Sequence, residues 1–335
     1  MNTSNYTGIR DFIFKGQNIV LSTHINPDGD TLGSALGLHH YLKQRGIQTT
    51  LLTPELASDN LRWLDSYDAF IKYKNDPEAF KNAVDQADII IHIDYNAFHR
   101  TGNDVSSIFE KVEHSKQHLM IDHHPNPAEG FAAYISDPSA CATAQLVYQL
   151  IDYMGGGEDL NTQSASCLYT GLITDTGSFS YGMEDEKPYL IAAALVRTGI
   201  DDRLIHEKIY STNSLNRLKL SGFAISEKLE ILENGKWALI SLTKEELAKY
   251  DYQAGDTEGL ANTALSINGV LAAVLLTEKD GKIRLSFRSK GDFAVNRIAR
   301  EHFGGGGHLN AAGGDSFLSM NETIAKLKAC MNVSK

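Results

Sequence analysis

The chain has 335 residues, with 31 Lys and Arg against 42 Asp and Glu, and a formal net charge of −11. This balance argues against a protein that coats long nucleic acid by neutralising many phosphates, and it fits a small phosphorylated ligand held by a few local cations better. The length allows two domains of ordinary size. The chain has no run of about twenty apolar residues and its first residues lack a signal-peptide pattern, so we expect a cytoplasmic protein without a membrane partner.

The three cysteines, Cys141, Cys167 and Cys330, are widely spaced and form no C-x-x-C pair. Neither a disulfide framework nor a thiolate zinc site is predicted.

Three short apolar runs, at residues 19–23, 89–91 and 119–121, are typical of buried parallel strands. Each leads into Asp or His side chains. A fourth cluster contains Asp175, which follows a helix-like segment at residues 163–173, and we expect this residue in a loop. In an open α/β sheet, ligands bind off the carboxyl ends of the strands, so these side chains should converge there. The residues expected to meet are His24, Asp28, Asp30, Asp94, His123 and Asp175, with Asp122 and His124 next to His123 in the sequence.

Several Asp side chains with two or more His favour a hard divalent cation of the Mn²⁺ or Mg²⁺ type. About seven ligands are too many for one ion, so two ions roughly 3.5–4 Å apart, sharing a carboxylate, are the natural number. Pro27 and Gly29 should keep the first ligand loop out of helix. A single Asp before a helix is more often a cap than a ligand, and Asp30 could be only that. Four such clusters at strand ends argue against this explanation for all of them. The pair His39 and His40 lies within a predicted helix, where neighbours point to different faces, and we interpret it as structural.

The C-terminal part carries cations and a glycine-rich stretch. Arg284, Arg288, Lys290, Arg297 and Arg300 stand close together, and the first two alternate with apolar residues on a strand-like run. Residues 304–307 are all Gly but no Walker motif follows. His308 comes next, and residues 311–314 have no bulky side chain, so the backbone could approach a phosphate there. Residues 187–216 have helical periodicity without motif residues. We therefore predict a first domain at 1–187, a helical linker at 188–216 and a second domain at 217–335.

These residues carry a resemblance to the DHH phosphoesterase superfamily. Residues 22–34 and 121–125 look like its first and third motifs, and the match continues through Asp94 and residues 169–179. Residues 288–289, 304–308 and 311–314 are similar to the DHH-associated domain that follows the catalytic one. Nearly the whole chain is covered, and its length and arrangement look most like the nanoRNase/pAp phosphatase (NrnA) type, a bifunctional oligoribonuclease.

The resemblance implies a fold, a ligand set and residue roles. The fold is α/β, with an N-terminal mostly parallel sheet flanked by helices, a smaller C-terminal α/β domain, and an active site in the cleft between them. His24, Asp28 and Asp94 would hold one ion, and Asp30, Asp94, His123 and Asp175 a second, most readily Mn²⁺ with Mg²⁺ as the alternative. His124, expected to point away from its neighbour if the segment is extended, would protonate the leaving oxygen or stabilise charge on the phosphoryl group, and Asp122 would orient a His. The substrate contacts would be Arg288, Ser289, Gly306, Gly307 and His308.

The implied substrates are short oligoribonucleotides, cut to mononucleotides, and 3'-phosphoadenosine 5'-phosphate (pAp), converted to AMP. No stable protein partner is implied, and a homodimer stays open. A linear or cyclic dinucleotide phosphodiesterase is the main alternative. A family II pyrophosphatase shares the catalytic motifs but has a different C-terminal domain, and the glycine-rich stretch at residues 304–314 argues against it. A RecJ-like exonuclease is expected to carry further domains that a chain of this length cannot hold. The complete ligand set argues against an inactive nucleotide-binding sensor.

Overall fold

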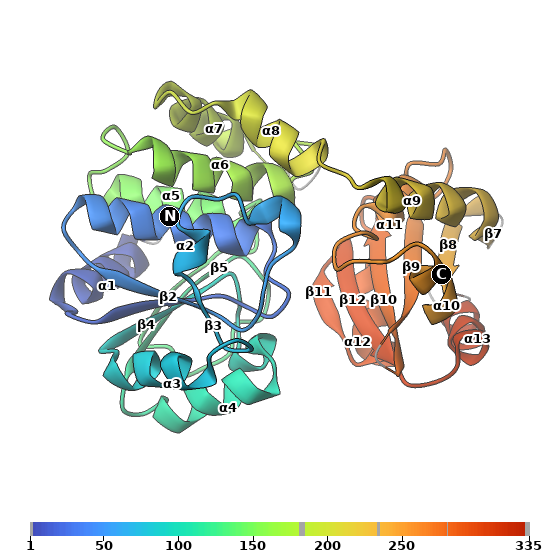
Figure 1. The fold of residues 1–335 in the computed structure, drawn as a ribbon, viewed down its shortest axis with the longest axis horizontal. Helices are drawn as coiled ribbons and strands as arrows, with labels where there is room; N and C mark the ends of the chain where they lie inside the picture. Colours follow the sequence, from blue (N-terminus) through green and yellow to red (C-terminus); the bar gives the residue numbers. More distant parts are fainter. Residues whose placement is uncertain (1–2, 181–184, 233–234, 280, 332–335) are drawn as a thin grey trace. The chain divides into compact units, whose positions relative to one another are not determined.

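The computed structural model describes residues 3–180, 185–232, 235–279 and 281–331. The chain divides into two compact units, Met1–Thr212 and Asn213–Lys335, each of which has its own sheet (Figure 1). Within the described residues, no helix is long and apolar enough to cross a membrane.

The first unit is built on a six-stranded, entirely parallel sheet with the order β3-β2-β1-β4-β5-β6. The predicted strands at residues 19–23, 89–91 and 119–121 overlap β1, β4 and β5, and the apolar residues of these runs are buried because helices cover both faces of the sheet. The strand order reverses at β1, which lies between β2 and β4, and this switch point is where open α/β sheets bind ligands. The strands are β1 (Ile19–Ser22), β2 (Thr49–Thr53), β3 (Ile71–Lys72), β4 (Ile89–Ile93), β5 (Gln117–Asp122) and β6 (Ala133–Ser136).

Helices cover both faces of this sheet (Figure 1). The larger core lies between one face and α1, α2, α5 and α6, and a smaller one between the other face and α3 and α4. The helices are α1 (Thr3–Lys15), α2 (Gly29–Gln44), α3 (Pro77–Gln86), α4 (Asn103–Val112), α5 (Thr143–Tyr153), α6 (Thr162–Asp175), α7 (Lys187–Arg197) and α8 (Asp202–Tyr210), with short 3-10 turns at Asp59–Leu61, Tyr67–Ala69 and Phe98–Thr101.

The backbones of helices α2 and α6 approach each other closely at two glycines. A Cβ atom on Gly33 in α2 would lie 2.4 Å from the carbonyl oxygen of Cys167 in α6, and one on Gly171 in α6 would lie 3.4 Å from Cα of Asp30 in α2 and 2.7 Å from Cβ of Ala144 in α5. Glycine is therefore required at both positions for the helices to approach. The close packing holds the start of α2, which carries Asp30, next to the end of α6, which carries Asp175.

The second unit has a mixed six-stranded sheet with the order β11-β12-β10-β9-β8-β7, in which only the β8–β9 pair is parallel among the described strands. One core packs α12 and α13 on the sheet, and another packs α9 and α11. The elements are β7 (Leu229–Leu232), β8 (Trp237–Leu242), β9 (Ala272–Lys279), β10 (Lys282–Ser289), β11 (Gly306–His308), β12 (Ala311–Ser316), α9 (Leu215–Glu227), α10 (Lys244–Lys249), α11 (Leu260–Leu265), α12 (Val295–Phe303) and α13 (Met320–Met331). The predicted α/β architecture with a smaller second domain is confirmed.

Candidate active site

The predicted metal ligands of the first unit gather at the carboxyl ends of β1, β4 and β5. Their ligand atoms form two groups, each with all atoms within 4.8 Å of one another: His24, Asp28 and Asp94 in one, and Asp30, His123 and Asp175 in the other. Asp30, Asp94 and both His residues are buried, whereas Asp28 and Asp175 are partly open to solvent.

Asp94 lies between the two groups. Its Oδ2 is 3.4 Å from Nε2 of His24, and its Oδ1 is 3.6 Å from Nε2 of His123. Asp94 directly follows β4 with a φ of 64°, a left-handed conformation that Asp tolerates better than most residues. Its N–H donates to the carbonyl of Ile121 over 2.9 Å, which holds this turn against β5. The end of the strand thus directs one carboxylate toward two imidazoles.

The tautomers of the two imidazoles follow from their backbone contacts. Nδ1 of His24 is 2.8 Å from the carbonyl oxygen of Ile25, and Nδ1 of His123 is 3.1 Å from that of Ala140. A carbonyl only accepts hydrogen bonds, so Nδ1 carries hydrogen in each ring. In the neutral tautomer Nε2 then presents its lone pair to the carboxylates. Two electron-rich groups face each other favourably only with a cation, either a proton or a metal ion, between them.

The pKa shifts within the cluster also indicate that it needs a cation. Burial alone would lower the pKa of His123, but Asp175, Asp94 and Asp30 raise it to about 10. Burial, together with Asp94 and Asp175, raises the pKa of Asp30 well above its ordinary value. Burial and nearby carboxylates raise the pKa of Asp175 to about 6, against the opposing effect of His123. Burial would also raise the pKa of Asp94, but the imidazoles around it lower it overall. The centre therefore holds more negative charge than its own His residues neutralise easily.

The first ligand loop differs from its prediction in two respects. The helix begins at Gly29, so Gly29 is part of α2 and does not keep the segment out of helix. The N-cap is Asp28, whose Oδ1 accepts from the N–H groups of Asp30 and Thr31 at 3.1 and 3.0 Å, while its Oδ2 lies 3.8 Å from His24. Asp28 therefore caps α2 with one carboxylate oxygen and faces His24 of the cluster with the other. The interpretation of Asp30 as only the cap of this helix is wrong, because Asp30 lies inside the first turn.

Asp175 also sits differently, because it is the last residue of α6 and not part of a loop. The helix continues past residue 173, and Asp175 reaches the cluster from its end.

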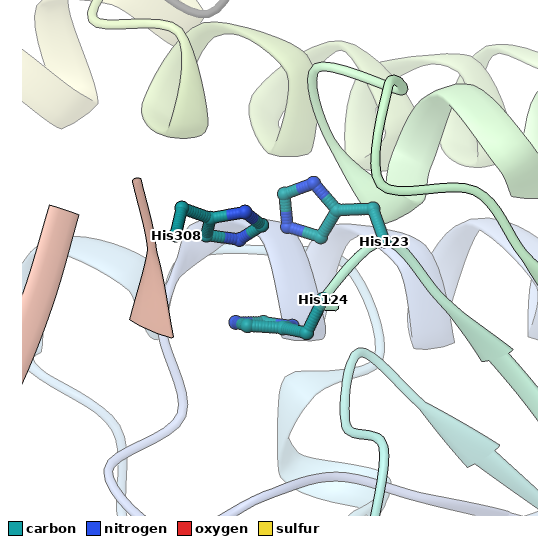
Figure 2. A group of neighbouring side chains, drawn as sticks. All are labelled: His123, His124 and His308. Atoms are coloured by element: carbon teal, nitrogen blue, oxygen red, sulfur yellow. The ribbon is translucent and has the colours of Figure 1, made fainter. Parts of the chain in front are cut away.

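Asp122 and His124 form a pair beside the cluster. Asp122 ends β5, its Oδ2 accepts from the N–H of His124 over 3.0 Å, and its Oδ1 is 2.8 Å from Nδ1 of that ring. This Asp-centred turn means that the segment is not extended, and the expectation that His124 points away from His123 is wrong. The ring centroids are 4.9 Å apart in an edge-to-face arrangement (Figure 2). Both rings reach Asp94, since Nδ1 of His124 is 3.7 Å from its Oδ1.

The structure adds polar supports that sequence reasoning missed. The side chain of Asp30 accepts from the N–H groups of Thr143 and Ala144 at 2.6 and 2.9 Å and from the hydroxyl of Ser34 at 3.2 Å. The hydroxyl of Thr143 also donates to Oδ1 of Asp94 over 2.8 Å. In sequence, Thr143 looks like an ordinary helix-start residue, and it is 113 residues from Asp30. No local sequence pattern predicts the contacts of Thr143 with Asp30 and Asp94.

In the second unit, Arg288 and His308 lie in one row of the sheet. Arg288 of β10 pairs with Ala311 of β12, and His308 of β11 pairs with the same Ala311 from the other side. Residues directly opposite one another in antiparallel strands share a face, so both side chains leave the same face, about 10 Å apart across two strand spacings. The small side chain of Ala311 stands between them.

The neighbouring candidates have different surroundings. Gly307 has a φ of 135°, and a Cβ there would lie 2.4 Å from the carbonyl oxygen of Ala311. Ser289 is buried on the opposite face, where its hydroxyl donates to the carbonyl of Phe293 over 2.5 Å and accepts from Nδ2 of Asn310 over 2.9 Å. Of the other cations, Lys290 donates to the carbonyl of Val270, and Arg297 pairs with Glu301.

Comparison with known proteins follows the same division of the chain. Residues 18–172 match the N-terminal domain of the DHH family, and residues 235–332 match the DHHA1 domain. The bifunctional oligoribonuclease and PAP phosphatase NrnA of Bacillus subtilis is 31% identical over 92% of this chain and 95% of its own length. The cyclic-di-AMP phosphodiesterase GdpP of Geobacillus thermodenitrificans is 26% identical over 97% of this chain, which spans 48% of GdpP.

A solved structure agrees closely with the fold. The crystal structure of an exopolyphosphatase-related protein from Bacteroides fragilis superposes with a TM-score of 0.91 at 36% identity, covering 98% of this chain and 96% of that one. With both domain matches in order along the chain and this degree of identity to full-length relatives, the protein belongs to the DHH family, with a DHH N-terminal domain followed by a DHHA1 domain.

Proposed function

We propose that this protein is a metal-dependent phosphoesterase that hydrolyses short oligoribonucleotides to mononucleotides and converts pAp to AMP. The observation that carries the proposal is the position of Asp94, whose two carboxylate oxygens face two different imidazoles in a buried acidic cluster. The relative from Bacillus subtilis, which the chain matches over nearly its full length, supports the choice of substrates.

The donor set fits two divalent ions. Ligand atoms about 2.1 Å from one octahedral or tetrahedral ion lie roughly 3.0–3.4 Å apart. The distances from His24 to its two carboxylates are 3.4 and 3.8 Å, and those from His123 to its three are 3.5, 3.6 and 3.9 Å, which a small inward movement would bring into range. Carboxylates with imidazoles and no thiolate favour Mn²⁺ or Mg²⁺. His24, Asp28 and Asp94 would hold one ion, and Asp30, Asp94, His123 and Asp175 the other.

Bound there, two such ions would act as Lewis acids, which would lower the pKa of water and offset the negative charge of a phosphoryl group. The side chains of the centre have separate roles. Asp94 fixes the spacing between the two halves of the site. The backbone contacts of His24 and His123 keep each Nε2 directed at the carboxylates.

His124 would protonate the leaving oxygen of the substrate. Its Nδ1–H donates to Asp122, which is buried, so the carboxylate orients the ring. Asp122 therefore acts through His124.

The row formed by Arg288 and His308 would bind a phosphate of the substrate. A guanidinium presents a planar pair of donors that matches two phosphate oxygens. Gly306 and Gly307 allow close approach of the β11 backbone, and Ala311 leaves space over the sheet between the two side chains. Ser289 would contribute by fastening the turn after Arg288 through Phe293 and Asn310.

The test is a substrate and metal panel on the purified protein. Chelated protein is supplied with Mn²⁺, Mg²⁺ or Ca²⁺ and offered pAp, a ribodinucleotide, a long RNA, a cyclic dinucleotide and pyrophosphate in parallel. We expect hydrolysis of pAp and the dinucleotide with Mn²⁺, and little with Ca²⁺, whose larger and looser shell clamps a phosphoryl group poorly. Full activity in chelator would refute the metal requirement. Hydrolysis confined to the cyclic dinucleotide would favour the alternative suggested by the GdpP relative.

A further inference from the structure

We propose that Thr143 is a positioning residue that holds Asp30 and Asp94, one from each half of the metal centre, in a single geometry, and thereby sets the affinity for divalent ions. This inference rests on the proposed function, because it assigns a role within the same centre. Thr143 is the first residue of α5, is fully buried, and is not one of the proposed ligands.

Two different groups of Thr143 make the two contacts. Its backbone N–H donates to Oδ2 of Asp30 over 2.6 Å, and its side-chain hydroxyl donates to Oδ1 of Asp94 over 2.8 Å. One residue thus connects a carboxylate on α2 with a carboxylate after β4. Because the backbone makes one contact and the side chain the other, substitution can remove the second without the first.

The contact to Asp30 is part of how α5 begins. The first N–H groups of a helix have no partner within it and carry partial positive charge. The N-cap of α5 is Ala142, which has no side-chain acceptor, and the carboxylate of Asp30 takes that place by accepting from Thr143 and Ala144. The helix start therefore anchors Asp30 and, through the same residue, reaches Asp94.

The contact to Asp94 fixes the direction of a carboxylate that has two tasks. With Oδ1 held by the Thr143 hydroxyl, this oxygen stays 3.6 Å from Nε2 of His123, and Oδ2 stays 3.4 Å from Nε2 of His24. Rotation of the carboxylate would take both oxygens out of these positions together. Loss of the hydroxyl should consequently weaken both halves of the centre, and not only one.

A purely structural explanation makes a different prediction. If Thr143 mattered only as a well-packed residue at a helix start, Thr143→Val, which keeps the shape, would be harmless, and Thr143→Ser, which loses a methyl group, would be the more damaging change. If the hydroxyl positions Asp94, the order is reversed.

The experiment measures Mn²⁺ binding to the full chain without substrate, by calorimetric titration and by electron paramagnetic resonance. We expect Thr143→Val to weaken Mn²⁺ binding by about 10–100-fold, the usual effect of removing a hydrogen bond to a ligand, and to lose the signal of spin-coupled ion pairs. Thr143→Ser should remain close to the wild type. The control is Thr170→Val, which removes another fully buried threonine hydroxyl, one that donates to the carbonyl of Ser166 in its own helix. It should bind Mn²⁺ as the wild type does.

Thermal unfolding in chelator checks that each variant folds, and Thr143→Ala, which also lacks the hydroxyl, replaces the valine variant if that one does not. Wild-type affinity in a folded variant without the hydroxyl would overturn the role of Thr143 while leaving the metal centre standing. Absence of Mn²⁺ binding by the wild type itself would overturn the proposed metal centre and this inference with it.

Discussion

Replacing Asp94 by Asn is the most informative perturbation of the centre, because it keeps the size of the side chain and removes its charge. Asp122→Asn is the matched comparison. Both residues are buried Asp at neighbouring strand ends, but Asp94 faces His24 and His123, whereas Asp122 makes its hydrogen bond to the ring of His124. The two variants therefore separate loss of a shared ligand from loss of an orienting group.

The expected magnitudes differ by at least about tenfold. A bound ion contributes several kcal/mol of transition-state stabilisation, and each 1.36 kcal/mol is a factor of ten in rate, so weakening two ions together should lower kcat/KM by about 1,000-fold or more. Asp122→Asn replaces a charge-assisted hydrogen bond worth about 1.5–3 kcal/mol by a weaker one, which corresponds to roughly 10–100-fold at most.

The assay is steady-state hydrolysis of a ribodinucleotide at several Mn²⁺ concentrations, with thermal unfolding in chelator as the control for folding. Asp122→Asn should bind Mn²⁺ like the wild type, and its defect should persist at saturating metal. Asp94→Asn should bind Mn²⁺ weakly. Equal loss of activity in both variants, at equal metal occupancy and equal thermal stability, would refute the bridging position of Asp94.

Three further predictions concern the substrate row, the helix contact and a buried imidazole. Arg288→Ala should leave Mn²⁺ binding unchanged and mainly raise KM for pAp and the dinucleotide; unchanged kinetics would exclude Arg288 from the substrate site. Gly33→Ala should destabilise the protein by about 1–3 kcal/mol, because its Cβ would lie 2.4 Å from a carbonyl oxygen, and chemical denaturation measures this; a neutral effect would show that α2 and α6 separate easily. Burial, with smaller effects of His40 and Lys43, lowers the pKa of His39 to about 4, against about 6.5 in the unfolded chain. Its contribution to the free energy of unfolding is therefore complete above pH 6.5 and is lost as the pH falls toward 4. A His39→Asn variant should lose less stability over that interval than the wild type, and parallel pH profiles would contradict this.

Much of the framework is visible in the sequence because burial on both faces leaves continuous apolar runs. That is why residues 19–23, 89–91 and 119–121 indicate β1, β4 and β5 without structural information. Parallel strands also bring their carboxyl ends to one edge, so the convergence of Asp94 and His123 follows from the predicted topology.

The details of the centre depend on contacts that no local pattern encodes. The Thr143 contact to Asp94 joins residues 49 positions apart and requires α5 to begin beside β4. The ring direction of His124 depends on the turn that Asp122 makes with the next backbone N–H groups, whereas alternation along a strand predicts the opposite side. Likewise, only the position of the helix start decides whether Asp28 or Asp30 caps α2.

The most direct test of the central claim is the anomalous scattering of manganese in crystals of the protein grown or soaked with Mn²⁺. Two peaks, roughly 3.5–4 Å apart and both in contact with the carboxylate of Asp94, are predicted for a dinuclear centre. The first should also contact His24 and Asp28, and the second Asp30, His123 and Asp175. A single peak, or two peaks that do not share Asp94, would contradict the account.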